Sequence, residues 1–317
     1  MNGLITIFSK ELSDHFSSYR FIFLFGLIAM VSLITTFMAG MSLSKDLSGV
    51  AKPEFVFLML FTSSGAQFSL VQFVAFFGPL IGLILGFDTI NRERNEGTLS
   101  KLLSQPIYRD AMINGKFLAG VVMIVLMMSS ILLVVSGLGL IILGVIPGIE
   151  EICRLFIYLI ISIFYLSFWL GISILFSIVF RSVATSALAG IATWIFFSFF
   201  IYIGANAVSS ALIPEAEQSA DGLILKLKIE KALTLASPLQ LYTDSTATII
   251  DPMRRTNKMI LQMGMMEQLS ISRFSGPLPL DQSILVVVPY IITIIAITLI
   301  CFAISYATFM RQEIRSV

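Results

Sequence analysis

Six long apolar runs dominate this sequence and decide what the chain can fold into. A bilayer core of about 30 Å needs roughly 20 apolar residues per helical crossing. Of the 317 residues, 57% are hydrophobic and only 12% are charged, and the mean hydropathy is +0.96. We therefore predict an all-α integral membrane protein. The six predicted transmembrane helices are residues 21–41, 68–87, 117–145, 155–180, 183–203 and 284–309.

The distribution of charge predicts the orientation. An even number of crossings places both termini on one side, and short loops rich in Lys and Arg favour the cytoplasm. The short loops on the other side hold only Lys45, Lys52 and Arg154. We expect a multi-pass protein of the cell inner (plasma) membrane with both termini in the cytoplasm. Its basic residues there are Lys10, Arg20, Arg92, Arg94, Lys101, Arg109, Lys116, Arg181, Arg311 and Arg315.

A net charge of +1 provides no global basic field, so nucleic acid is not an expected partner. Residues 1–20 place apolar side chains at every fourth position, as in an amphipathic helix lying in the headgroup region. A helical lead-in to the first crossing is the alternative. The apolar positions are Leu4, Phe8, Leu12 and Phe16.

The apolar runs as drawn contain no Asp, Glu, Lys or Arg. Ion-coupled transporters generally place ionisable groups at membrane depth, so we expect this chain to draw its energy from elsewhere. Scattered hydroxyls provide either a weakly polar path or small packing contacts. These hydroxyls belong to Ser129, Ser130, Ser162, Ser173, Ser177, Thr193 and Ser198.

The chain divides into residues 1–20, residues 21–204 with the first five crossings, an external segment 205–283, and residues 284–317 with the last crossing and a cytoplasmic tail. In the external segment, Leu225, Ile229, Leu233 and Ala236 form a helical stripe. We expect two or three amphipathic helices on the outer membrane surface as a lid, although residues 226–231 also fit a short strand. The methionines from 253 to 266 fit an apolar face or a Cu(I) site.

The loop 88–116 is the most charge-dense stretch of the chain. Residues 88–96 extend the second crossing, Gly97 stops that helix, and Thr98 caps a short helix that Pro106 ends. Apolar anchors flanked by charges are typical of a helix that docks in a groove on a soluble partner. The anchors are Leu99, Leu102 and Leu103, and the charges are Arg94, Glu96 and Lys101.

This loop resembles that of the type-2 permeases of ABC exporters. Glu93, Glu96, Gly97-Thr98-Leu99, Leu102-Leu103, Pro106 and Gly115-Lys116 match the family's pattern. The lead-in Lys10-Glu11-Leu12 with Asp14 and Arg20 is similar to that of the family. Ser237-Pro238-Leu239 with Leu241-Tyr242 is similar to an element of one branch, which includes the nitrous-oxide-reductase maturation permease and sodium or antibiotic exporters.

The resemblance implies a homodimer, or a pair with a near relative, bound to two copies of a separate ABC ATP-binding subunit. That subunit would bind ATP and Mg, and residues 98–103 would form the coupling helix that docks on it. Membrane lipid and an extracytoplasmic protein are further candidate partners. The expected coupling residues are Glu93, Arg94, Glu96, Gly97, Thr98, Leu99, Lys101, Leu102, Leu103 and Arg181.

The sequence predicts no ATPase site, cofactor or metal site in this chain. Gly97 is followed by Thr-Leu-Ser-Lys without the second glycine of a Walker A motif, and Lys116 is followed by Phe117. His15 is the single histidine. Two other functions remain open: a stand-alone channel or carrier, and a membrane scaffold whose external segment binds a protein.

Overall fold

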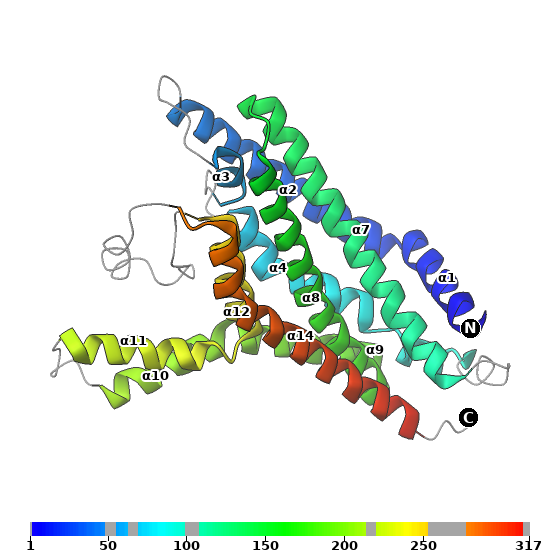
Figure 1. Ribbon diagram of the computed structural model, residues 1–317. Coiled ribbons are helices and arrows are strands. Elements are labelled where there is room, and N and C mark those ends of the chain that lie inside the picture. Colours follow the sequence, from blue (N-terminus) through cyan, green and yellow to red (C-terminus); the bar gives the residue numbers. More distant parts are fainter. Residues whose placement is uncertain are drawn as a thin grey trace.

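The computed structural model describes residues 2–47, 55–62, 69–98, 108–213, 220–252 and 277–312, and these ranges contain helices and no β-strand (Figure 1). The predicted all-α fold is confirmed. In chain order the helices are α1 (Asn2–Ser17), α2 (Tyr19–Asp46), α3 (Val56–Thr62), α4 (Leu70–Gly86), α5 (Asn91–Asn95), α7 (Arg109–Leu143), α8 (Ile149–Val179), α9 (Val183–Ile195), the π-helical η1 (Phe196–Phe200), α10 (Ile201–Leu212), α11 (Ala220–Thr234), α12 (Pro238–Ile250) and α14 (Leu280–Arg311).

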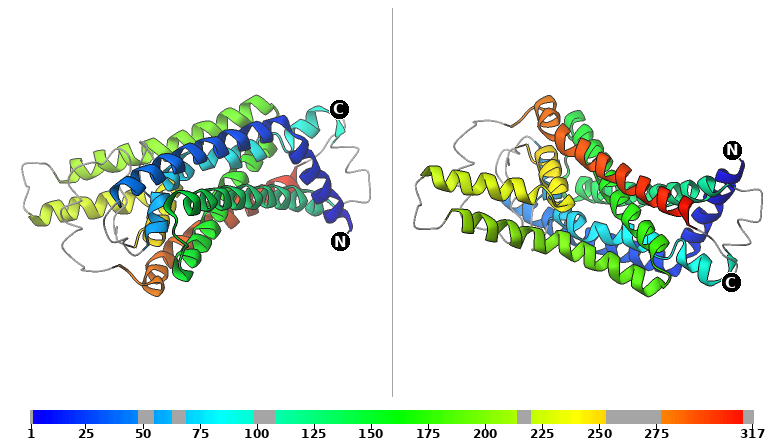
Figure 2. Two further views of the ribbon diagram at one scale, coloured as in Figure 1. Left: turned by 90° about the horizontal axis from the view of Figure 1, so that it is seen from above. Right: turned by 90° about the horizontal axis from the view of Figure 1, so that it is seen from below.

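Within the described ranges, six helices are long and apolar enough to cross a membrane, which confirms the six predicted crossings. They are α2, α4 with α5, α7, α8, the run α9–η1–α10, and α14. Helix α1 and the C-terminal end of α14 lie at one end of the bundle, called the terminal end below (Figures 1 and 2). The α10–α11 hairpin projects at the opposite end (Figure 2).

Helix α8 is the centre of the bundle and packs against α4, α7, α9, α12 and α14. Its contact with α4 is close because two glycines of α4 face it. A Cβ on Gly82 would lie 2.6 Å from the carbonyl oxygen of Leu166, and one on Gly86 would lie 2.7 Å from Cβ of Ser173. Small residues let membrane helices approach to backbone contact, and dispersion forces then stabilise the pair.

Pro79 lies inside α4 and has no N–H to donate to the carbonyl of Ala75, one turn earlier. The hydroxyl of Tyr165 donates to that carbonyl at 2.9 Å. The indole N–H of Trp194 donates to the neighbouring carbonyl of Phe76 at 3.1 Å. A proline is therefore tolerated in the second crossing because side chains of α8 and α9 satisfy the carbonyls around it.

The external segment differs from the expected lid. Residues 226–231 are helical, so the strand alternative is wrong, and α11 packs against α10. Helix α12 does not lie on the surface but packs against α4, α8 and α14. Tyr242 is fully buried, stacks on Tyr165 with ring centroids 4.3 Å apart, and lies 2.8 Å from the hydroxyl of Ser162. The methionines from 253 to 266 lie outside the described residues.

The polar composition of α12 explains why the sequence places residues 238–250 in the external segment. Ser245 and Thr246 are buried, yet both hydroxyls donate to the carbonyl of Tyr242 in the same helix. Ser237, before the first turn, donates to the carbonyl of Phe197 in the π-helical turn. Hydroxyls that bond to backbone carbonyls can enter an apolar interior, because no polar group is left without a partner.

Several predicted path-lining serines are packing groups of the same kind. Ser173 donates to the carbonyl of Leu83 at 2.7 Å, and Ser162 donates to that of Tyr158 at 2.8 Å. Both serines are buried. Ser173 joins α8 to α4, and Ser162 also contacts Tyr242 of α12, so both hydroxyls serve packing. Of the two readings of the hydroxyls, the structure supports small packing contacts at these positions.

Arg154 connects three helices at the opposite end of the bundle. Its guanidinium is fully buried and donates to the carbonyl of Ile249 at the end of α12, to the carbonyl of Leu278, and to Ser283 in α14. The carboxylate of Glu150 balances its charge at 2.7 Å. A residue expected in a short outer loop thus joins α8, α12 and α14.

Candidate functional site

The charge-dense loop begins where α4 ends at Gly86, and its helical extension is interrupted at residues 87–90. The next helix, α5, spans Asn91–Asn95. The interruption takes the N–H groups of Ile90 and Asn91 away from α4, and the hydroxyl of Ser177 in α8 accepts both, at 2.8 and 3.1 Å. Ser177 therefore fixes the direction in which α5 leaves the bundle.

Gly97 stops α5 as predicted, since its φ of +68° lies in the left-handed region that favours glycine. Thr98 stays a predicted cap of the next helix, because the N–H groups that it would bond lie outside the described residues. Its hydroxyl donates to the carbonyl of Glu93 at 3.2 Å and so satisfies the end of α5. Leu99, Lys101, Leu102 and Leu103 lie outside the described residues, so their docking role stays a prediction.

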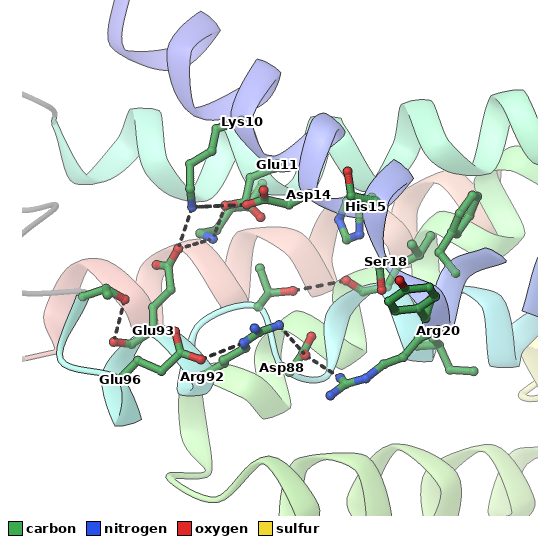
Figure 3. A pocket seen from close by; sticks show the side chains of 18 residues that line it. Lys10, Glu11, Asp14, His15, Ser18, Arg20, Asp88, Arg92, Glu93 and Glu96 are labelled. Atoms are coloured by element: carbon green, nitrogen blue, oxygen red, sulfur yellow. Dashed lines mark hydrogen bonds and ion pairs between the residues drawn. The ribbon is translucent and has the colours of Figure 1, made fainter. Parts of the chain in front are cut away.

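A buried charge cluster holds α5 against α1 and α7 (Figure 3). The ammonium of Lys116 lies 2.7 Å from Oε1 of Glu11 and 2.9 Å from Oε1 of Glu93. Only 2% of the Lys116 side chain is exposed, so this ion pair is shielded from water. Lys10, which is half exposed, adds a longer contact to Glu93 at 3.5 Å. One cation therefore joins three segments that are far apart in the sequence.

Gly115 explains how α1 comes close enough for this ion pair. A Cβ at Gly115 would lie 2.9 Å from Cγ2 of Ile7, so only a glycine admits α1 at this distance. Ile7 and Glu11 form the buried face of α1. In the predicted stripe, Phe16 is exposed, whereas Leu12 is partly buried and packs against the core. The interfacial position of α1 stays a prediction.

Two titratable groups of α1 respond to this environment. Burial alone would raise the pKa of the Glu11 carboxyl, but the ammonium of Lys116 outweighs it and the pKa lies below its ordinary 4.5. Burial lowers the pKa of His15 from its ordinary 6.5, opposed by Glu11 and Asp88. The docked α1 therefore favours an ionised Glu11 and a neutral His15.

A second set of contacts ties α5 to the end of α14. The guanidinium of Arg94 donates to the side-chain carbonyl of Gln312, whose amide donates to the backbone carbonyl of Ile178 at 3.1 Å. Arg109, at the start of α7, donates to the backbone carbonyl of Gln312 at 3.1 Å. The ends of α5, α7, α8 and α14 are thus joined around one glutamine.

The structure brings some predicted site residues together and separates others. Glu93 and Arg94 point into the bundle, whereas Glu96 and Arg181 are exposed. Glu96 pairs with Arg92 at 2.9 Å. The backbone carbonyl of Arg181 accepts from the amide of Asn95 at 3.2 Å, so the turn between α8 and α9 lies beside α5.

Sequence reasoning missed the pairing of Lys116 with Glu11 and Glu93. The signal was present: a lysine opens an otherwise apolar run, and a glutamate interrupts an amphipathic helix. The apolar runs are free of ionisable groups as drawn, but the helices extend past those runs and bury charges at their ends. No sequence pattern indicated which acid would meet the lysine.

A cavity of about 800 Å³ opens at the terminal end between α1, α2 and the junction of α4 with α5 (Figure 3). Its wall carries charged side chains of both signs, including Arg20, Asp88 and Arg92, with hydroxyls and apolar groups. Among the described residues, no three metal-ligating side chains gather closely enough to hold an ion.

The polar contacts at the terminal end connect helices to one another. Glu11, Glu93 and Glu96 each form an ion pair with a lysine or an arginine, and α5 is bonded to several helix ends at once. The model of a family described as ABC-2 family transporter protein matches residues 5–314, nearly the whole chain. This chain belongs to the ABC-2 transporter family. A search of curated proteins finds no match.

Membership of the ABC-2 family makes this chain a membrane component of an ABC transporter, consistent with a permease subunit. The family also implies an ATP-binding partner. The branch that contains the nitrous-oxide-reductase maturation permease stays a prediction.

Proposed function

We propose that this ABC-2 protein is the membrane-spanning permease subunit of an ATP-driven exporter, energised by a separate ATPase subunit. The observation that supports this function is the attachment of α5. This short helix is bonded through Lys116 to α1 and α7, through Ser177 to α8, and through Arg94 and Gln312 to α14. A force applied to the loop after α5 would reach its own crossing, three further transmembrane helices and α1.

In this proposal the terminal end faces the cytoplasm, and the leucines at 99, 102 and 103 anchor the coupling helix in a groove of the ATPase. Lys101, Glu96 and Arg181 lie at the rim and set the register through charge. Gly97 separates the docking helix from α5, and Thr98 closes α5 below it. Glu93 and Arg94 pass the movement inward through their ion pair and hydrogen bonds.

The functional unit is proposed to be a homodimer with two ATPase subunits, which bind the ATP and Mg. ATP binding draws the ATPases together and favours one of two packings of the transmembrane helices. The close contact at Gly82 and Gly86 and the hydrogen bonds of Ser177 favour movement of α4, α5 and α8 as one body. No cofactor or nucleic acid has a part in this mechanism.

A co-purification experiment tests the docking role. Leu99→Asp with Leu102→Asp places two charges on the anchor face, and we expect the tagged permease to lose its ATPase. Ser100→Asp with Ser104→Asp is the matched control, because it adds the same charge on the other side of a helix. The proposal is wrong if the leucine variant retains a full complement of ATPase.

Reconstitution separates this function from a stand-alone channel or carrier. Liposomes that contain the permease alone should show no solute flux, and addition of its ATPase with ATP and Mg should start transport. Flux through the chain without any ATPase would favour the channel or carrier. A scaffold would show neither flux nor stimulated ATP turnover in either preparation.

A further inference from the structure

The cavity at the terminal end shares Glu93 and Lys116 with the buried charge cluster, and its position in the bundle indicates what it can bind. Its wall includes Tyr19 and Phe21, at the point where α2 enters the membrane, and Ile84 and Leu85 of α4. Tyr19 is 89% exposed and lies at the start of a crossing, where tyrosines typically contact lipid headgroups. The cavity therefore lies at the depth of phospholipid headgroups, with apolar groups on its membrane side.

One part of the wall suits a phosphate group. The side chains of Arg20 and Arg92 are each 60% exposed, and each keeps donors beyond those used in its ion pair with Asp88 or Glu96. The first residues of α2 also line the cavity, and the first N–H groups of a helix have no acceptor within it. The side chain of Ser18 does not cap them.

Another part of the wall suits an ammonium group. Asp14 has a side chain that is 63% exposed, and its long contact with Lys10 at 3.5 Å leaves acceptor capacity. Glu93 is nine-tenths buried in the same wall, and its Oε2 has no hydrogen-bond donor among the residues that the structure describes. Both carboxylates accept hydrogen bonds, so they favour an ammonium that carries N–H groups over a quaternary one.

The net charge of the cavity wall favours some phospholipid headgroups over others. Its carboxylates are Glu11, Asp14, Asp88, Glu93 and Glu96, and its cations are Lys10, Arg20, Arg92 and Lys116. The carboxylates exceed the cations by one, so a headgroup with a phosphate and no cation would meet net repulsion. A headgroup with both charges places each opposite its counterpart.

We propose that this cavity binds the phosphoethanolamine headgroup of a membrane phospholipid. The phosphate lies against Arg20, Arg92 and the N-terminus of α2, and the primary ammonium lies toward Asp14 and Glu93. In Figure 3 the labelled side chains of Arg20, Arg92 and Asp88 converge on one side, and Asp14 and Lys10 extend from α1 on the other. A bound headgroup would join α1 to α2 and α5, so membrane composition would influence how firmly α1 is held.

Lipid retention by the full-length protein tests this site. Nanodiscs of phosphatidylcholine are prepared with a minority of phosphatidylethanolamine or of phosphatidylglycerol, and native mass spectrometry measures which lipid stays bound after release. We expect phosphatidylethanolamine to be retained about tenfold over either other lipid, the scale of one charge-assisted hydrogen bond. Equal retention of the three lipids, or preference for phosphatidylglycerol, overturns the proposal.

Three variants locate the binding. Asp14→Asn and Arg20→Gln should each reduce the preference for phosphatidylethanolamine about tenfold, whereas Arg311→Gln, an exposed basic residue at the same end outside the cavity, should not change it. Arg20→Gln also breaks the ion pair with Asp88 and can unfold the protein. Asp14 is exposed, so Asp14→Asn tests the binding site without this effect. Unchanged retention in Asp14→Asn overturns the site.

A soluble competitor distinguishes a lipid from a cytosolic ligand with the same chemistry. Free phosphoethanolamine is added to the protein in phosphatidylcholine nanodiscs, and binding is measured by calorimetry. We expect much weaker binding than that of the lipid, because the apolar wall at Phe21 and Leu85 gains no contact with a free headgroup. Binding as tight as that of the lipid overturns the assignment to a membrane phospholipid.

Discussion

Single residues hold this bundle together by satisfying polar groups that the membrane would otherwise leave without partners. Lys116 is the clearest case, because two carboxylates of other segments share its buried ammonium. Breaking a buried ion pair leaves an uncompensated charge, which costs far more than loss of a surface pair. The stability of the terminal end therefore depends on one side chain of α7.

Lys116→Met tests this dependence. We expect the free energy of unfolding to fall by about 3–5 kcal/mol, because Glu11 and Glu93 lose their shared cation. Lys10→Met is the matched control, since Lys10 is half exposed and contacts the same carboxylates, and it should cost less than about 1 kcal/mol. Denaturant titration of the purified protein in detergent measures both, and equal losses would contradict the buried role of Lys116.

Tyr165 offers a second test at the residue scale. Tyr165→Phe leaves the carbonyl of Ala75 without a donor beside Pro79, and we expect a loss of about 1–3 kcal/mol of stability. Pro79→Ala restores a backbone N–H to that carbonyl, so Tyr165→Phe should cost less in this background. A double-mutant cycle measures the coupling, and additive effects would show that the hydroxyl does not serve the proline position.

Whole helices contribute through the closeness of their contacts. The contact between α4 and α8 brings backbone atoms together at Gly82, and the side chain of Ile7 in α1 packs directly on Gly115 of α7. Such contacts leave little freedom for one helix to slide on the other, because the packing has few alternative arrangements. Rigid pairs of this kind suit a transporter that moves helices as bodies.

Gly82→Ala should separate α4 from α8. A Cβ there would lie 2.6 Å from the carbonyl oxygen of Leu166, which is backbone and cannot turn away, so we expect a loss of about 1–3 kcal/mol. Gly137→Ala is the control, because nothing lies within 4 Å of its Cβ position in α7. Alanine should there be neutral or stabilising. Thermal unfolding in detergent compares the two, and similar midpoints would contradict the close contact.

Docking of α1 should weaken as the pH falls. The pKa of His15 is lower when α1 is docked, so undocked α1 binds a proton more readily. The docked state therefore loses stability as the pH falls below about 6.5, the ordinary pKa of histidine. The lowered pKa of Glu11 adds a further loss below its ordinary 4.5. The charged groups that face His15 are Glu11, Asp88, Lys116 and Asp14.

Hydrogen exchange of α1 in nanodiscs measures this effect. Protection should fall between pH 7.5 and 5.5, within the range set by the ordinary pKa of His15 at 6.5. His15→Gln should flatten that part of the profile. An unchanged profile in the variant would show that another group controls the docking of α1.

At the scale of the whole molecule, both ends of the described chain lie at one end of the bundle, and α3 and the loop before α8 lie at the other (Figures 1 and 2). The positive charge of the terminal end predicts that this end faces the cytoplasm. The charge-dense loop, the interfacial helix and the turn at Arg181 are then all within reach of a soluble ATPase.

Cysteine labelling tests this orientation. In a Cys153→Ser, Cys301→Ser background, Ile146→Cys should react with a membrane-impermeant maleimide from outside, because Ile146 is 85% exposed in the loop before α8. Ser13→Cys in α1 should react only after the membrane is permeabilised. The reverse pattern would place the loop 88–116 outside the cell and contradict the proposed coupling.

The crossings and the stop at Gly97 were predictable from the sequence, because both depend on local properties. An apolar run long enough to span a bilayer must satisfy its own backbone, and only a helix does so. Likewise, glycine after a charged helical stretch adopts the left-handed conformation wherever that stretch lies.

Tertiary structure alone decided which partners meet. The sequence contains many acids that could pair with Lys116, and the choice of Glu11 and Glu93 follows from the approach of α1 at Gly115. The sequence places residues 238–250 in the external segment because hydroxyls count as polar in any window of sequence. Those hydroxyls bond within the helix, so the burial of Tyr242 depends on contacts with α4, α8 and α14 that no local pattern encodes.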